Sequence, residues 1–185
     1  MYGSFGSERF YEVIPVPENA KKERSKLRII AMCGVFAALV FIGTQLRIPT
    51  AIGYINLGDG VILISSFFLG PAAFFPAAIG SALSDLIAGY PMYIAPTFVI
   101  KGLMGLVGAI LMTKSHGKKA GGFLLRLIAS LAAELVMVAG YFVFEALYYD
   151  MAAATGSVVF NLIQAGCAIV IALPLTYAIR VKKQK

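Results

Sequence analysis

The sequence has little charge, no tryptophan, one histidine and two cysteines. Only 14% of its 185 residues are charged, whereas 59% are hydrophobic, and its mean hydropathy is +0.84. So little polar surface cannot cover a water-soluble domain. The single histidine, His116, excludes a histidine-based metal site or catalytic triad, and no glycine-rich loop ends in Lys-Ser or Lys-Thr to cradle ATP phosphates. We therefore expect no enzyme, no metal and no cofactor.

The cysteines, Cys33 and Cys167, lie inside apolar runs without the spacing of a metal or redox site, so we interpret them as small packing residues. Apolar runs of about 17–25 residues match the hydrocarbon core of a bilayer, which is ~30 Å thick. The pattern predicts an all-α integral membrane protein with six transmembrane helices. The expected spans are 27–48, 57–70, 72–90, 95–113, 122–147 and 157–180.

The second span is too short to cross a bilayer alone, so we expect it to be tilted or partly buried by other helices. The pairs Gly70-Pro71 and Tyr90-Pro91 punctuate the third span on both sides, because proline cannot continue a helix. Tight connections are predicted at both places.

Basic residues are distributed unevenly along the chain. If six spans are threaded, fourteen of the sixteen Lys and Arg residues fall on one side, which places both termini in the cytoplasm. The placement of the basic residues behind the net charge of +7 is thus explained by membrane topology, and we expect no nucleic-acid partner. Only Arg47 and Lys101 fall elsewhere; the one-sided residues are Arg9, Lys21, Lys22, Arg24, Lys26, Arg28, Lys114, Lys118, Lys119, Arg126, Arg180, Lys182, Lys183 and Lys185.

Three parts of the chain follow from this reading. Residues 1–26 form a polar cytoplasmic tail without the apolar core of a secretory signal, 27–180 form a six-helix membrane domain, and 181–185 form a basic cytoplasmic tail. The expected location is a multi-pass position in the bacterial cytoplasmic membrane, with the lipid bilayer as solvent.

Ionisable and amide side chains within the spans are candidates for a site, because such groups are costly in lipid and usually face a cavity or each other. We expect Lys101 to pair with Asp85 or Glu134, either as a buried ion pair that fixes helix register or as part of a site. Glu134, Tyr141 and Glu145 share a helix face, as do Asn161 and Gln164. They suit a small polar ligand, although interhelical hydrogen bonding remains the alternative. The candidate site comprises Tyr54, Asn56, Asp59, Asp85, Lys101, Glu134, Tyr141, Glu145, Asn161 and Gln164.

Glycines mark two further features. The segment 53–59 is a candidate lid over a cavity, or else an ordinary turn in which Asp59 caps a helix. Gly102, Gly105 and Gly108 repeat on the fourth span, and such stripes allow close helix packing. Gly34 and Ala38 form a similar pair on the first span, where internal packing and docking of another membrane protein are both possible.

Several of these segments together resemble a known family. They are 54–59 (YINLGD), 80–86 (GSALSDL) running to Gly89-Tyr90, Lys101-Gly102, 140–142 (GYF) and 161–164 (NLIQ). Their order and spacing resemble the substrate-binding S components of energy-coupling factor (ECF) vitamin transporters over residues 27–180. The riboflavin, hydroxymethylpyrimidine and pyridoxine group is the most similar.

The resemblance implies a six-helix fold that binds a vitamin near the outer face and releases it inside by toppling in the membrane. It also implies two kinds of partner, a transmembrane coupling protein and two ATPase subunits. The first helix would dock through an Ala-xxx-Ala motif, which here is Gly34-xxx-Ala38, so the docking residues would be Ala31, Gly34, Ala37 and Ala38.

Two other functions remain open from the sequence. A self-sufficient secondary carrier or channel would use Lys101, Asp85 and Glu134 as an ion or proton path. A structural or assembly factor would bind no ligand saturably.

Overall fold

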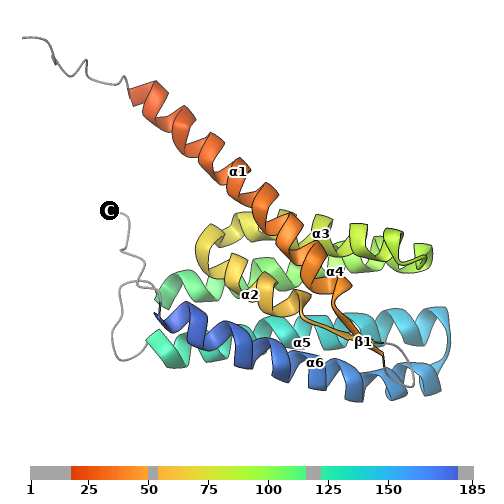
Figure 1. Cartoon of the computed structure of the whole chain (residues 1–185). Helices are drawn as coiled ribbons and strands as arrows, with labels where there is room; N and C mark the ends of the chain where they lie inside the picture. Colours follow the sequence, from red (N-terminus) through yellow and green to blue (C-terminus); the bar gives the residue numbers. More distant parts are fainter. Residues whose placement is uncertain (1–17, 50–53, 116–121, 179–185) are drawn as a thin grey trace, which may run out of the picture.

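The computed structural model describes residues 18–49, 54–115 and 122–178. Within them, six α-helices form a bundle in which successive helices run back and forth (Figure 1). The bounds are α1 Glu18–Gln45, α2 Gly58–Leu69, α3 Phe74–Ile87, α4 Pro91–Met112, α5 Gly122–Tyr148 and α6 Met151–Ala178, with 3₁₀ turns η1 Gly70–Ala73 and η2 Thr113–Ser115. The helices follow the six apolar runs. His116 lies outside the described residues.

A short hairpin separates α1 from α2. Strand β1, Arg47–Pro49, pairs antiparallel with β2, Tyr54–Asn56, so that Arg47 lies opposite Asn56. The sequence did not predict this hairpin, because each strand is only three residues long.

The helices α2 and α3 are 12 and 14 residues long, which corresponds to ~18 and ~21 Å at the α-helical rise. The chain turns back between them at η1 (Figure 1), where Gly70 adopts a φ of +56° ahead of Pro71. The expected short second span and tight connection are both present. By length and hydropathy, five helical stretches of the described residues can cross a membrane, and one of these joins α2, η1 and α3. The count of six crossings therefore stays a prediction.

Helix α1 begins at Glu18, nine residues before the predicted start of the first span. Its early part stands clear of the bundle in Figure 1, and the side chains of residues 22–30 are all exposed. The described ends of α1 and α6 lie toward the same end of the bundle (Figure 1). The side of the membrane that this end faces stays a prediction.

The glycine face of α4 explains how closely the helices approach. A Cβ atom on Gly102 would lie 2.5 Å from the ring of Phe74, and one on Gly105 would lie 2.9 Å from the carbonyl oxygen of Ala73. This stripe therefore serves internal packing, as the sequence predicted for the fourth span. Around it, α4 packs against α2, α3 and α5, and the core contains large apolar side chains such as Phe67 and Met104.

Two residues have surroundings that the sequence did not indicate. Arg126, in the first turns of the fifth helix, is buried: its Nε donates to the Ser115 hydroxyl over 3.2 Å, and its Nη1 donates to the carbonyl of Thr176. Its guanidinium also lies 4.5 Å from the ring centroid of Phe67, so it ties α2, α5 and α6 together. Cys167 is exposed on α6 and is not an internal packing residue.

Candidate functional site

A cavity of about 560 Å³ opens where the hairpin meets the beginnings of α4 and α6 and the end of α5. Its volume is in the range of small-molecule sites. Four helices besides the hairpin supply most of its walls. The lining residues are Thr44, Asn56, Ser81, Asp85, Tyr90, Tyr93, Thr97, Lys101, Tyr141, Glu145, Tyr149, Ala153, Ser157, Phe160, Asn161 and Gln164.

Tyrosines form one wall of the cavity. The ring of Tyr93 lies 6.4 Å from those of Tyr141 and Tyr149 and 5.1 Å from that of Phe144, measured between centroids. Rings held in this way present flat apolar faces with hydroxyls at their edges, which suits a planar ligand with polar substituents.

Glu145 lies where α4, α5 and α6 converge on the cavity. The Tyr93 hydroxyl donates to its Oε1 over 3.2 Å, and the Ser157 hydroxyl donates to its Oε2. Glu145, Tyr93 and Ser157 all line the cavity, so this carboxylate is held at the wall by hydroxyls from two neighbouring helices.

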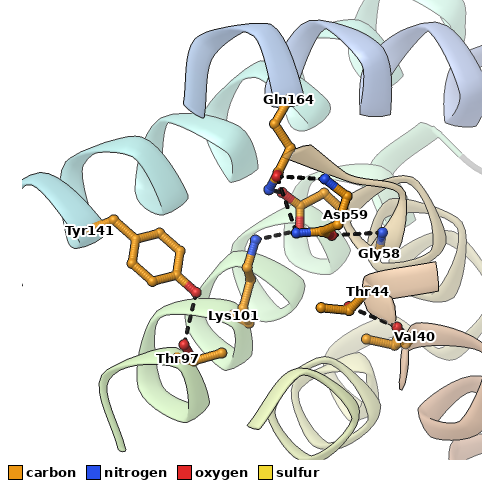
Figure 2. Close-up of polar contacts among 9 residues, drawn as sticks. Val40, Thr44, Gly58, Asp59, Thr97, Lys101, Tyr141 and Gln164 are labelled. Atoms are coloured by element: carbon orange, nitrogen blue, oxygen red, sulfur yellow. Dashed lines mark hydrogen bonds and ion pairs between the residues drawn. The ribbon is translucent and has the colours of Figure 1, made fainter. Parts of the chain in front are cut away.

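Lys101 forms a buried ion pair with Asp59 (Figure 2). The expectation that Lys101 would pair with Asp85 or Glu134 is thus wrong. The reason is that α2 begins beside α4 and brings Asp59, in its first turn, onto the ammonium. The alternative role of Asp59 as a helix cap is also wrong, because its side chain is fully buried and directed to Lys101.

Gln164 connects this pair to the hairpin, as Figure 2 shows. Its Nε2 donates to Asp59 Oδ2 over 2.6 Å, while its Oε1 accepts from the backbone N–H and the side-chain amide of Asn56 at 3.0 and 3.1 Å. Asn56 Oδ1 in turn accepts from the Gly58 N–H at 2.9 Å. A chain of hydrogen bonds therefore runs from β2 through α6 to α2 and α4. Asn56, Asp59, Lys101 and Gln164 are called the buried network below.

Glu134 lies next to the buried network and outside the lining of the cavity. It is 3% exposed, interacts electrostatically with both Asp59 and Lys101, and has no hydrogen-bond partner on either oxygen. Helix α5 thus carries its carboxylates to two depths, with Glu145 at the cavity and Glu134 among the buried helices.

Seven of the ten predicted site residues line the cavity: Asn56, Asp85, Lys101, Tyr141, Glu145, Asn161 and Gln164. Asp59 and Glu134 lie behind Lys101, and Tyr54 is placed in β2 by its backbone alone. The amide Nδ2 of Asn161 and the hydroxyl of Ser81 are buried without a hydrogen-bond partner. Those two groups offer hydrogen bonds to a ligand.

Sequence reasoning missed several lining residues. Tyr90 and Tyr93 lie one turn apart at the start of α4, and Tyr149 follows α5; Thr97 shares a 3.0 Å hydrogen bond with the Tyr141 hydroxyl. Their signal was the gathering of tyrosines at one end of the apolar runs. Aromatic residues at membrane interfaces are common enough that this signal does not identify a site.

The proposed docking residues of α1 divide into two groups. Ala31, Gly34 and Ala38 are exposed, and a Cβ atom on Gly34 would meet nothing within 4 Å. Ala37 is half-buried, and its carbonyl oxygen would lie 2.5 Å from a Cβ on Gly80 of α3. The two sides of α1 therefore differ: one packs against α3, and the other presents small residues outward.

Comparisons with known proteins identify the family of the chain. The chain is 31% identical over 139 residues to an uncharacterized protein of Pyrococcus woesei, and the match covers 74% of this chain and 88% of that protein. The family model of the ECF-type riboflavin transporter S component matches residues 24–181. Its span includes every helix that lines the cavity, and the family consists of transport subunits and not of enzymes. The chain belongs to the S components of ECF-type riboflavin transporters, and it is a transmembrane protein that binds a substrate for transport.

Proposed function

We propose that this chain captures a vitamin or vitamin precursor outside the cell, with riboflavin as the first candidate, for ATP-driven uptake by partner subunits. The observation that carries the proposal is the cavity of about 560 Å³, whose lining combines a tyrosine wall with buried hydrogen-bonding groups that have no partner. A flavin ring system has the flat faces and the carbonyl acceptors that such a cavity would recognise. Hydroxymethylpyrimidine and pyridoxine share this chemistry in a smaller form.

Orientation follows the positive-inside rule. With both termini in the cytoplasm, the hairpin and the mouth of the cavity would face outward, because the hairpin follows α1 and lies at the far end of the bundle from the described ends of the chain (Figure 1). The residues that would contact the ligand are Asn56, Asp85, Lys101, Tyr141, Glu145, Asn161 and Gln164, with Asp59 and Glu134 supporting them from behind.

The test of capture is binding by the purified chain in nanodiscs without nucleotide. Riboflavin should bind saturably in isothermal titration calorimetry, and native mass spectrometry should identify any small molecule that co-purifies. A pyrimidine or pyridoxine in the mass spectrum would keep the binding role and change the vitamin. The absence of saturable binding to all three would contradict the proposal.

Partner dependence requires a second experiment. Liposomes containing the chain alone should not accumulate riboflavin, and addition of the transmembrane coupling protein with two ATPase subunits and ATP should start uptake. Accumulation by the chain alone, driven by a pH gradient or a membrane potential, would instead support a secondary carrier.

The outward face of α1 is the proposed docking surface for the coupling protein. Gly34→Leu should abolish ATP-driven uptake while riboflavin binding is unchanged, because the added side chain points away from the bundle. Gly166→Leu on α6 is the matched control, since Gly166 is exposed and a Cβ there also meets nothing within 4 Å. Equal uptake in the two variants would remove α1 as the docking surface.

A further inference from the structure

Glu134 is a carboxyl group without a hydrogen-bond partner in the middle of the bundle. At the α-helical rise it lies ~18 Å from the start of α5 at Gly122 and ~21 Å from its end at Tyr148. Its side chain is 3% exposed, and neither of its oxygens accepts a hydrogen bond. One turn earlier on the same helix face, the buried hydroxyl of Ser130 also lacks a partner. Both groups lie outside the cavity lining, so a ligand in the cavity would not supply that partner.

The charges around Glu134 do not balance. Lys101 on α4 is the cation that it faces, and Asp59 on α2 is a second carboxylate beside the same ammonium. Helix α6 carries no charged residue along its described length, and the lysine of η2 is exposed. Arg126, on the same helix as Glu134, donates to partners in η2 and α6 instead. Among the described residues, two buried carboxyl groups therefore share one ammonium.

Asp59, and not Glu134, holds this ammonium (Figure 2). Asp59 Oδ1 accepts from Lys101, and its Oδ2 accepts from Gln164 Nε2 over 2.6 Å, so both oxygens are occupied. An ionised carboxylate without such contacts is strongly disfavoured in a membrane bundle, and a buried acid avoids this penalty by keeping its proton. A metal ion would lie beside an ammonium, and the described residues contain no group of three His, Cys, Asp or Glu side chains that could hold one.

We propose that Glu134 is a buried proton-binding site and a reserve counterion for Lys101. With the proton on one of its oxygens, Glu134 is neutral and leaves the ammonium on Asp59. When the proton passes to water, two carboxylates compete for the ammonium, which keeps its own protons throughout. This inference goes beyond the proposed function, and it holds whether or not a ligand is bound.

The proton on Glu134 has a consequence for the hairpin. The Lys101–Asp59 pair is one end of the hydrogen-bond chain that runs through Gln164 to Asn56 of β2. A neutral Glu134 stabilises this arrangement because it does not draw Lys101 away from Asp59. An ionised Glu134 would weaken the pair and with it the attachment of the hairpin to the helices.

Infrared spectroscopy of the ligand-free protein, near neutral pH in a detergent without ester groups, tests the proton site. A protonated carboxylic acid has a carbonyl stretch that a carboxylate lacks, so the wild-type protein should show this band and Glu134→Gln should lose it. Glu145→Gln is the matched control: it changes a carboxylate on the same helix that two hydroxyls already satisfy, so the band should remain. A wild-type protein without the band, or a band that survives in Glu134→Gln, would overturn the proton site. Failure of Glu134→Gln to fold would also overturn it, because the amide matches the size and neutrality of the protonated acid.

The reserve role is tested by removing the first counterion. In Asp59→Asn, Glu134 is the remaining carboxyl group beside Lys101, so it should release its proton and the infrared band should disappear. The double variant Asp59→Asn with Glu134→Gln leaves the ammonium without a counterion, and its unfolding temperature should lie about 10 °C below that of Asp59→Asn. A band that persists in Asp59→Asn, or equal unfolding temperatures of the two variants, would overturn the reserve role.

The pH dependence of stability counts the proton. The folded state keeps the proton of Glu134 where the unfolded state has released it, so raising the pH favours the unfolded state until the folded protein also releases the proton. Relative to Glu134→Gln, which has no proton to lose at this site, the unfolding temperature of the wild-type protein should fall by about 3–5 °C for each pH unit above about pH 5. A difference that stays constant with pH would overturn the proton site. Stabilisation of the wild-type protein by sodium over potassium, absent in Glu134→Gln, would assign the site to a metal ion and overturn it as well.

Discussion

The buried network and the cavity wall use the same kinds of side chain in opposite ways. In the network, Asp59 has both carboxylate oxygens occupied, one by Lys101 and the other by Gln164. At the wall, the hydroxyl of Ser81 and the amide Nδ2 of Asn161 are buried without a partner. The difference teaches that position as well as hydrogen-bond saturation sorts these groups: the saturated groups of the network hold helices together, and the unpaired groups that line the cavity are available to a ligand. Glu134 also lacks a hydrogen-bond partner but lies outside the lining.

The largest expected effect comes from breaking the ion pair of the network. Lys101→Met would leave Asp59 buried without its cation, which should lower the free energy of unfolding by about 3–5 kcal/mol. Thermal unfolding in detergent would measure the loss. The double variant Asp59→Asn with Lys101→Met removes both charges and should recover much of it; a double variant as unstable as the single one would show that the pair is not what stabilises this region.

Gln164→Leu should have the next largest effect, because it keeps the bulk of the side chain and removes the link between hairpin and helices. The Asn56 amides lose their acceptor and Asp59 loses one donor, at about 1–3 kcal/mol for each group left unsatisfied. Unfolding and riboflavin affinity should both be affected, since Gln164 belongs to the network and also lines the cavity. A change in riboflavin affinity with no change in stability would show that Gln164 contacts the ligand and contributes little to holding the helices together.

Asn161→Ala should reduce riboflavin affinity by about 1–3 kcal/mol and leave stability almost unchanged, because its unpaired Nδ2 has no partner within the protein to lose. Titration calorimetry measures the first quantity and thermal unfolding the second. Glu134→Gln is the control from the buried side: it lies outside the cavity lining, so affinity should stay within about twofold of wild type, which is under 1 kcal/mol. If Glu134→Gln weakened riboflavin binding and Asn161→Ala did not, Glu134 would belong to the ligand site and Asn161 to the helix packing.

The smallest effect is expected at Thr97, whose hydroxyl shares a hydrogen bond with Tyr141 at the border of the two regions. Thr97→Val keeps the shape and removes this bond, so affinity should fall by about 0.5–1.5 kcal/mol. Tyr141→Phe removes the same bond and should cost the same amount if the phenol hydroxyl has no direct ligand contact. A clearly larger loss in Tyr141→Phe would indicate that this hydroxyl contacts the ligand itself.

The sequence predicted the positions of the helices well, because apolar runs and the prolines at 71 and 91 mark where helices cross and turn. It missed the start of α1. Residues 18–26 are charged and therefore look like a tail on a hydropathy scale, yet Glu, Ala, Lys and Arg are good helix formers.

The sequence predicted which polar residues belong to the candidate site, but not which of them form ion pairs with one another. Seven predicted residues line the cavity, since polar groups within apolar runs are rare enough to stand out. The Lys101–Asp59 pair was not predicted, because hydropathy gives neither the rotation of a helix about its axis nor the depth of a short helix such as α2. Tyr93 and Tyr149 escaped notice because aromatic rings are also usual packing residues.

The exposed beginning of α1 has a mechanical consequence. Lys22, Arg24, Lys26 and Arg28 follow one another every second residue, so their cations emerge on both sides of a helix that no other helix covers. These four basic side chains are most stable among lipid headgroups, where they can reach phosphates while their aliphatic stems stay in hydrocarbon. We therefore expect this end of α1 to be held by the bilayer surface and not by the other helices of the bundle.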